Sequence, residues 1–266
     1  MRVIITRPPR EASKWVAALL ESGYKSVALP LVEVAPPSDA QAVKEAGRRL
    51  VDYDGVMFVS GNAVEHFFAL NPLLNPVFCA GAAIKTRAYA TGPGTVAALL
   101  RAGAEPAFID APGLDSPQFD SEALWAVISP TLRAGQKVLI VRGAGAQSDE
   151  LRTGAGHGRD WFANQVREAG ASVDYVVSYQ RVPVRLQGES LDLALQASSD
   201  GSVWMFSSSE AIANLVASCP GQDWHVAKAV VTHPRIGEAA CRAGFVRVSE
   251  SRPSLAALLA TIESMQ

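Results

Sequence analysis

Two hydroxyl-rich segments each follow an apolar run typical of a strand and precede a helical pattern. Ser60-Gly61-Asn62 comes after residues 55–59, and Ser207-Ser208-Ser209 comes after residues 202–206. The first turn of a helix leaves backbone N–H groups without intrahelical partners and carries the positive end of the helix dipole. Both segments therefore predict sites for a carboxylate or a phosphate. The alternative is ordinary capping, in which a serine hydroxyl only accepts a hydrogen bond from the helix backbone.

A second pair of turns follows later strands in the same way. Its members are Thr91-Gly92-Pro93-Gly94 and Thr232-His233-Pro234-Arg235. We expect Thr91, Thr232, Pro234 and Arg235 to belong to the same anion-binding surface. His233 could act as an acid, but a single histidine beside a helix start more often caps the helix or meets solvent.

Two arginines end the first strand expected in each half of the chain. Arg7 and Arg142 could bind carboxylates through the planar fork of the guanidinium group, and we include Gly143, which follows Arg142. Surface ion pairing is the alternative. His, Asp and Cys residues do not occur together at the spacing of a nucleophile or a metal site, so the sequence predicts binding chemistry without a metal.

The composition is that of a globular protein with a sizeable core. The chain has 266 residues, 48% hydrophobic and 19% charged, which favours two domains. A net charge of -2 argues against broad binding to nucleic acid. Apolar runs stay shorter than the roughly 18 residues that cross a membrane, and MRVIITRPPR passes directly into a strand and a turn. We therefore expect a cytoplasmic protein that does not bind a membrane.

Strand-like runs alternate with helical patterns along almost the whole chain. This alternation predicts an α/β protein built on parallel sheets. The first expected helix covers residues 11–22 and ends before Gly23. The expected strands are residues 3–5, 24–29, 56–59, 77–80, 106–109, 137–141, 172–177, 202–206, 229–232 and 245–248.

Three blocks recur in the same order in the two halves. ITRPPREASKWVAALLESGYKSVALP is echoed by IVRGAGAQ and DWFANQVREAGASVDYVVSY, MFVSGNAVEHFF by WMFSSSEAIANL, and ATGPGTVAALLRAGAEPAFI by VTHPRIGEAACRAGFVRVS. Repeated blocks of strand, loop and helix predict two similar doubly wound domains.

Two proline-containing segments occupy equivalent places after the first strand-helix-strand unit of each half. Residues 31–41 and 178–190 have the composition of extended connections, because proline fixes φ and its predecessor favours extended geometry. If they pair as a two-stranded hinge, the middle of the chain forms one domain and the two ends form the other. The alternative is two contiguous halves divided near Gly135.

Seven blocks stand in an order that resembles one known family. They are VIITRPPREASKWVAALLESGYKSVALPLVEVAP, DGVMFVSGNAVEHFF, ATGPGTVAALLRAG, KVLIVRGAG, GRDWFANQVREAGASVDYVVSYQRV, WMFSSSEAIANL and VVTHPRIGEAACRAGF. In this order they resemble uroporphyrinogen-III synthases, and the resemblance covers nearly the whole chain. It implies two flavodoxin-like α/β domains joined by a two-stranded β ladder. The first domain would comprise residues 1–35 plus 182–266, and the inserted one residues 36–181.

The resemblance also implies a reaction. Members of this family are lyases of heme biosynthesis that cyclise hydroxymethylbilane to uroporphyrinogen III, with inversion of ring D and loss of water. They generally act as monomers and need no metal or organic cofactor. A transient handover of substrate from hydroxymethylbilane synthase is a further expectation. The different-class alternative is a noncatalytic bilobal protein that closes on a small anion.

Tyr179 is the residue that we expect to donate a proton to the leaving hydroxyl. It follows the strand at 173–177, near the expected hinge, and it matches the tyrosine usually proposed for this role in the family. A phenol stays protonated at neutral pH and can donate to a departing oxygen. The alternative is a tyrosine that only packs on the hinge.

The chain departs from the family pattern at three places. Gly61 replaces another residue, and His233 and Arg235 stand where a Gly-Pro turn with a hydroxyl residue is usual. About ten additional glycine-rich residues lie between Gly145 and Gly158, where we expect either a mobile flap or a loop with no role in the site. These glycines lack the spacing of a nucleotide-binding loop.

Overall fold

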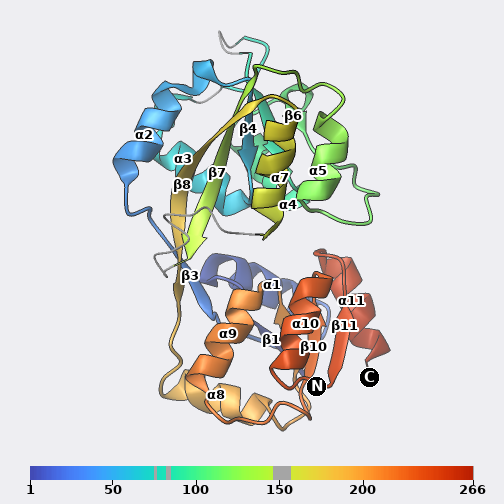
Figure 1. The fold of residues 1–266 in the computed structure, drawn as a ribbon. Coiled ribbons are helices and arrows are strands. Elements are labelled where there is room, and N and C mark those ends of the chain that lie inside the picture. Colours follow the sequence, from blue (N-terminus) through green and yellow to red (C-terminus); the bar gives the residue numbers. More distant parts are fainter. Residues whose placement is uncertain (75–76, 82–84, 146–156, 266) are drawn as a thin grey trace. The chain divides into compact units, whose positions relative to one another are not determined.

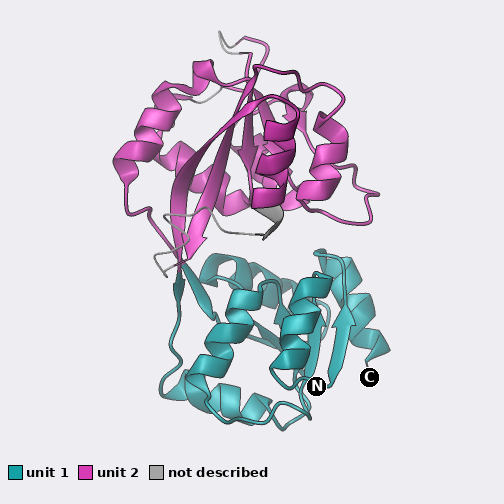
Figure 2. Cartoon of the chain, viewed as in Figure 1, with its two compact units in different colours: residues 1–33, 182–266 teal, residues 34–181 magenta. Residues whose placement is uncertain are grey.

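The chain forms two compact units. The computed structural model describes residues 1–74, 77–81, 85–145 and 157–265 (Figure 1). Unit 1 comprises residues 1–33 and 182–266, and unit 2 comprises Val34–Arg181 (Figure 2). The chain therefore passes between the units after Glu33 and after Arg181, whereas the predicted domain limits are 35 and 181. No described helix has the length and apolar character needed to span a bilayer.

Unit 1 is built on five parallel strands. They lie in the order β11-β10-β9-β1-β2. Numbered along the chain within the unit, this is the order 2-1-3-4-5 of flavodoxin-like folds. The strands are β1 (Arg2–Ile5), β2 (Lys25–Ala28), β9 (Val203–Phe206), β10 (Lys228–Val231) and β11 (Arg247–Glu250).

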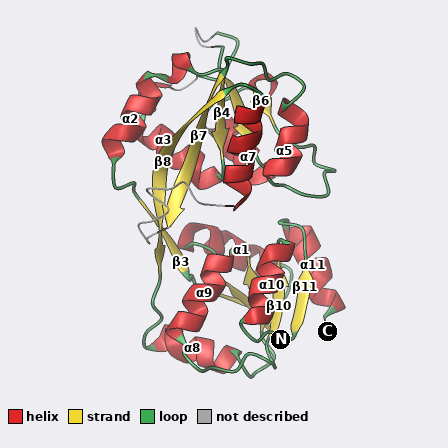
Figure 3. Cartoon of the chain, in the orientation of Figure 1, coloured by secondary structure: helices red, strands yellow, loops and turns green. Residues whose placement is uncertain are grey.

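Helices cover both faces of this sheet (Figure 3). Side chains alternate along β1, so that Val3 and Ile5 face one helical layer and Ile4 faces the other. The first layer holds α1 (Pro9–Glu21) and α11 (Leu255–Ser264). The second holds α8 (Glu189–Ala197), α9 (Ser209–Ser218) and α10 (Pro234–Arg242).

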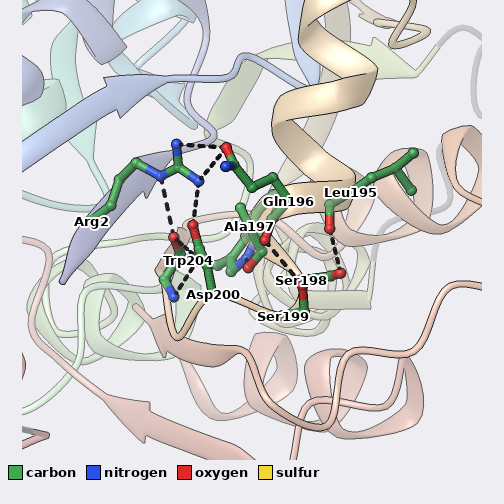
Figure 4. A network of polar contacts seen from close by, with 9 residues as sticks. Arg2, Leu195, Gln196, Ala197, Ser198, Ser199, Asp200 and Trp204 are labelled. Carbon is green, nitrogen blue, oxygen red and sulfur yellow. Dashed lines mark hydrogen bonds and ion pairs between the residues drawn. The ribbon is translucent and has the colours of Figure 1, made fainter.

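A polar network fixes the amino ends of β1 and β9 (Figure 4). Arg2 donates from Nη2 to Asp200 Oδ2 at 2.5 Å and from Nε to Ser202 Oγ at 3.3 Å. Trp204 Nε1 donates to Ala197 O at 3.1 Å, which joins β9 to the end of α8. The two Arg2 bonds connect segments about 200 residues apart in sequence and hold the amino ends of β1 and β9 in register.

Unit 2 is built on a second sheet, of six strands. The order is β3-β8-β7-β4-β5-β6. The pairs from β8 to β6 are parallel. The strands are β3 (Val32–Ala35), β4 (Gly55–Phe58), β5 (Arg87–Ala90), β6 (Ile109–Asp110), β7 (Lys137–Gly145) and β8 (Ser172–Pro183).

Two helical layers also enclose the sheet of unit 2. One layer contributes Phe67 and Leu99 to the core beside Phe58, and the other contributes Leu124 and Phe162. The first layer holds α2 (Ala40–Arg48), α3 (Gly61–Leu70) and α4 (Pro93–Arg101), and the second holds α5 (Ser121–Ile128) and α7 (His157–Glu168). Short 3-10 helices cover Leu50–Asp52, Pro72–Leu74 and Pro106–Phe108.

The two sheets repeat one arrangement, which confirms the predicted pair of similar flavodoxin-like folds. When β7 and β8 are matched to β1 and β2, the strands β4, β5 and β6 match β9, β10 and β11. The spatial order is then the same in both units. Along the chain, however, unit 2 forms the strands that match β9, β10 and β11 before those that match β1 and β2. The three recurring sequence blocks fall on these matched elements.

The two passages between the units lie on neighbouring strands. β3 and β8 are adjacent in the sheet order, and each contains one of the two boundaries. Val184 N donates to Leu31 O at 3.2 Å just outside these strands. This is the predicted pairing of the two proline-containing segments.

Two predicted strands differ from the structure, at residues 77–80 and 106–109. Residues 77–80 carry buried Val77 and Phe78 but form an irregular turn, and Glu105 N donates to Phe78 O at 2.8 Å. The strand in this part of the sheet is β5, ten residues later, and it begins with Arg87. Residues 106–109 are mostly a 3-10 helix followed by β6. A buried apolar run does not distinguish a strand from an irregular core segment.

Candidate functional site

Tyr179 and Ser60 form the centre of the candidate site in unit 2. Tyr179 lies on β8 with 5% of its surface exposed. Its Oη is 3.1 Å from Ser60 Oγ, and either hydroxyl could be the donor. Ser60 is also the N-cap of α3, because its Oγ accepts a hydrogen bond from Ala63 N at 3.2 Å. Capping and contact with the tyrosine therefore occur at the same serine.

A β-bulge turns Tyr179 toward α3. Arg142 on β7 pairs with Val177, whereas the next residue, Gly143, pairs with Tyr179, so Ser178 is an extra residue in β8. Val176 and Tyr179 consequently reach the same core cluster although they are three residues apart. In a regular strand they would face opposite sides of the sheet. The bulge thus brings the phenol to the side on which Ser60 and the His66 ring lie.

The turns that follow β4 and β5 lie side by side at the same edge. Gly61 begins α3, and a Cβ added there would lie 3.4 Å from Gly94 O and 3.5 Å from Ala98 Cβ, so α3 approaches α4 closely. Thr91 Oγ1 donates to Val59 O at 3.4 Å. Asn62 is partly exposed in the first turn of α3. The structure therefore brings together Ser60, Gly61, Asn62, Thr91, Gly143 and Tyr179 at the carboxyl ends of parallel strands.

Arg142 lies on the other face of this sheet. Its side chain is 5% exposed, and Cζ lies 5.0 Å from the ring centroid of Tyr175, which packs with the core beneath α5 and α7. Because Arg142 precedes the bulge, its side chain points away from the face that holds Tyr179. Contact of Arg142 with substrate remains a prediction.

The serine turn of unit 1 occupies the matching place after β9. Ser208 is the N-cap of α9, and its Oγ accepts a hydrogen bond from Glu210 N at 3.1 Å. Ser207 is partly exposed and Ser209 is exposed. The hydroxyl and backbone groups of this turn are therefore placed as in the turn at Ser60, but without a tyrosine bonded to the capping serine among the interactions described.

The neighbouring turn of unit 1 is capped by a histidine. His233 Nδ1 accepts a hydrogen bond from Arg235 N at 3.2 Å at the start of α10. Thr232 is partly exposed, and Pro234 and Arg235 are exposed. Phe206 and Val231 are paired residues of β9 and β10, so this turn lies beside the serine turn. Capping, the expected alternative for His233, is what the structure shows.

Arg7 follows β1 in unit 1. Its Nη1 donates to Glu11 Oε2 at 2.8 Å, and Cζ lies 4.8 Å from the ring centroid of Trp15. Its Nε is buried and has no hydrogen-bond partner among the described residues. One side of this guanidinium is thus engaged by Glu11 and Trp15 of α1, and the ion pair named as the alternative is present.

Two tyrosines of unit 2, Tyr53 and Tyr89, have raised pKa values. Burial raises the pKa of Tyr89 to about 12. Burial, followed by the hydrogen bond to Asp174, raises the pKa of Tyr53 to about 12. Among the described residues, no group of three or more His, Cys, Asp or Glu side chains could hold a metal ion.

Comparison with known proteins identifies the family. The family model described as "Uroporphyrinogen-III synthase HemD" matches residues 13–260, which is nearly the whole chain. The chain belongs to the uroporphyrinogen-III synthase family. The resemblance read from the seven sequence blocks is thereby confirmed.

Relatives in this family align with the chain from end to end. A protein of Synechococcus elongatus named uroporphyrinogen-III synthase is 28% identical over 274 residues, covering 98% of this chain and 94% of its own. A structure of uroporphyrinogen-III synthetase from Helicobacter pylori covers 100% of both chains with a TM-score of 0.60 and 16% identity. A mutant synthase from Thermus thermophilus covers 99% of this chain and 98% of its own, with a TM-score of 0.58 and 14% identity. At these identities the two structures support the fold.

In this member of the uroporphyrinogen-III synthase family, the described site and the sequence-based prediction differ in two respects. The predicted flap between Gly145 and Gly158 lies outside the described residues, apart from its last positions on α7. Ser178 and His66 were missed, although both contact the candidate site. The sequence carries no signal for Ser178, because a bulge depends on the pairing of two strands.

Proposed function

We propose that this chain is a uroporphyrinogen-III synthase, a lyase that cyclises hydroxymethylbilane to uroporphyrinogen III. The observation that carries the proposal is the family match over residues 13–260. The geometry supports it, because a buried phenol bonded to a capping serine lies beside the partly exposed N-termini of α3 and α4. The noncatalytic anion-binding alternative is not favoured by the family match.

In this proposal the helix N-termini hold the acidic side chains of the substrate. The turns at Ser60, Gly61, Asn62 and Thr91 would serve in unit 2, together with Arg142 and Gly143. The residues in unit 1 would be Arg7, Ser207, Ser208, Ser209, Thr232, Pro234 and Arg235. Backbone N–H groups and hydroxyls at such turns bind carboxylates. Holding the bilane folded selects how it closes, and orientation of this kind is a large source of rate.

Tyr179 acts as the proton donor in this mechanism. Its O–H donates to the hydroxyl carried by ring A, which leaves as water and gives a protonated azafulvene and the tyrosinate. Ser60 donates its own proton toward Tyr179 Oη, so the phenol proton remains directed at the substrate. Ring D then attacks through its substituted carbon, and the spiro intermediate fragments and recloses with ring D inverted. The proton released as the pyrrole is restored returns to Tyr179, so that protons balance over the cycle.

The remaining expectations belong to the same proposal. We propose that units 1 and 2 are the two domains, and that β3 and β8 form the hinge between them. The protein would act in the cytoplasm as a monomer, without a cofactor, and would receive substrate transiently from hydroxymethylbilane synthase. It would bind neither nucleic acid nor membrane.

The decisive experiment couples the purified protein to hydroxymethylbilane synthase and separates the porphyrinogen isomers. Type III product is expected, because closure in water without the enzyme gives type I. Tyr179→Phe should lower kcat by about tenfold to a hundredfold, at or below the lower end of the usual range for a positioned acid. Tyr89→Phe is the matched control, since Tyr89 is also a buried tyrosine of unit 2, and it should retain full turnover. Type I product alone would contradict the proposed activity, and full turnover by Tyr179→Phe would remove Tyr179 from the mechanism.

A further inference from the structure

The ring of Tyr179 occupies the space above Gly143. A Cβ added at Gly143 would lie 2.5 Å from Cε2 and 2.7 Å from Cε1 of Tyr179. Carbon atoms in contact normally stay about 3.5–4.0 Å apart. Any side chain at position 143 would therefore displace the ring, since the two residues are paired directly across β7 and β8.

The backbone of Ala63 connects both sides of the phenol. Its N–H donates to Ser60 Oγ at 3.2 Å, and its carbonyl accepts a hydrogen bond from Ser178 Oγ at 3.2 Å. Ser60 Oγ in turn contacts Tyr179 Oη, and Ser178 precedes Tyr179 in the chain. The first turn of α3, the bulge and the phenol thus form one closed circuit of bonds. Ser178 is completely buried, so this hydrogen bond is shielded from water.

A second glycine and tyrosine pair in the same sheet allows a comparison. A Cβ added at Gly55 would lie 2.6 Å from Tyr89 Oη. This pair lies between β4 and β5, with Tyr89 in the core cluster on the opposite face from Tyr179. A methyl group at Gly55 would disturb a buried tyrosine ring without reaching the candidate site.

We propose that Gly143 and Ser178 are positioning residues that hold the Tyr179 phenol against Ser60. Gly143 leaves room for the ring, and Ser178 fixes the bulge that turns the ring toward α3. Neither residue needs to touch the reacting atoms. The catalytic consequence rests on the proposed function, whereas the placement of the ring does not.

The test follows the ring and the turnover separately. The full chain is labelled with fluorotyrosine, and the fluorine resonance of residue 179 is assigned by its loss in Tyr179→Phe, which is practical because the chain has 5 tyrosines. Gly143→Ala should shift this resonance and lower kcat by about the factor produced by Tyr179→Phe, with KM changed less than about twofold. Gly55→Ala, the matched control, should shift the resonance of residue 89 and leave kcat unchanged.

Ser178→Ala provides a milder second variant, because it removes one hydroxyl and introduces no clash. It should also shift the residue 179 resonance and lower kcat by a smaller factor than Gly143→Ala. Combining Gly143→Ala with Tyr179→Phe should cost little more turnover than Tyr179→Phe alone, since both changes act through one group.

The outcomes distinguish the two proposals. An unshifted residue 179 resonance in folded Gly143→Ala overturns the positioning role of Gly143, and an unshifted one in Ser178→Ala overturns that of Ser178, whatever the activity. If Gly143→Ala does not fold, Ser178→Ala alone decides whether the bulge positions the ring. A shifted resonance with unchanged kcat upholds the positioning role and overturns Tyr179 as proton donor.

Discussion

At the scale of single residues, Ser60 serves both the helix and the phenol. Its Oγ accepts from Ala63 N and contacts Tyr179 Oη. A hydroxyl has one proton to donate and two lone pairs, so both contacts can be made at once. The reading of this serine as an ordinary cap is therefore correct but incomplete.

Replacing Ser60 should separate these two contributions. Ser60→Ala is expected to lower the free energy of unfolding by about 1 kcal/mol through the lost cap. It should also lower kcat, because Tyr179 loses its partner. Ser254→Ala is the control, since Ser254 caps α11 through the same kind of bond to Ala257 N at 3.3 Å. Urea unfolding and steady-state assays measure both effects. Equal kcat values for the two variants would count against a role of Ser60 beyond capping.

The raised pKa values of Tyr53 and Tyr89 predict a loss of stability in alkali. Both pKa values are raised to about 12 in the folded chain, mainly by burial. An unfolded phenol loses its proton near pH 10. Raising the pH from about 10 to about 12 therefore lowers the free energy of unfolding, because the unfolded chain releases phenol protons that the folded chain retains. The stabilisation is fully present below that window.

Urea unfolding at a series of pH values measures this effect. The free energy of unfolding should fall as the pH rises above about 10. Tyr53→Phe and Tyr89→Phe should each make the fall less steep, since each removes one titrating phenol. If both variants followed the wild-type slope, the two tyrosines would not be the source.

Single residues were predicted from sequence to different extents. Ser60 and Tyr179 could be found, because a hydroxyl after a buried strand and a family tyrosine are visible along the chain. Their mutual contact could not, since it depends on the bulge at Ser178. The orientation of Arg142 depends on the same pairing, and its sequence position alone gives no sign that it faces Tyr175.

At the scale of elements, contact with a neighbouring helix limits which residue types a helix position can accept. Gly47 in α2 lies beneath the side chain of Asn71, and a Cβ there would lie 2.9 Å from Asn71 Nδ2. Asn71, the C-cap of α3, donates from Nδ2 to Phe67 O in its own helix and to Val43 O in the middle of α2. This amide has little freedom to move away.

Two glycine-to-alanine changes should consequently have opposite effects on the free energy of unfolding. Gly47→Ala is expected to destabilise the protein by about 1–3 kcal/mol through overpacking. Gly237→Ala in α10 is the control, because its Cβ would make ordinary contacts of 3.5 Å with Val231 Cγ2 and 3.7 Å with Val248 Cγ1. It should stabilise the protein by up to about 1 kcal/mol, the difference in helix propensity. Thermal or urea unfolding measures both, and stabilisation by Gly47→Ala would contradict the packing argument.

Element types could be predicted where the local pattern was clear, as for the long amphipathic helix α1 and for β9, whose residues are all apolar and buried. The failure at residues 77–80 came from a short run whose apolar side chains are buried without strand pairing. β5 was missed because its short run begins with a charged residue, Arg87, whose guanidinium pairs with Asp110 on β6. That ion pair lies between two strands, so it is invisible in the local pattern.

At the scale of the whole molecule, each unit has its own hydrophobic core. Leu215 of α9 belongs to the core of unit 1, and Leu139 of β7 belongs to the core of unit 2. Both are almost fully buried. A cavity in one core should therefore weaken that unit first.

Hydrogen exchange measured by mass spectrometry can test this expectation. Leu215→Ala should cost about 2–5 kcal/mol and speed exchange in β9 and β10, with β4 and β7 little changed. Leu139→Ala is the matched change in unit 2 and should give the reverse pattern. Uniformly faster exchange across all four strands in either variant would show that the units open together.

The repeated strand order has a consequence for the origin of the chain. If the sequence is divided just before β7, each of the two parts contains five flavodoxin-like strands in their usual succession. The first part has β1, β2, β4, β5 and β6, and the second has β7 to β11. In the folded protein the first two of these strands in each part lie in one sheet, and the last three lie in the sheet of the other unit. The molecule thus has the connectivity of a tandem duplication whose copies have exchanged segments, which is domain swapping within a single polypeptide. The insertion of unit 2 and the paired passages through β3 and β8 follow from that one exchange.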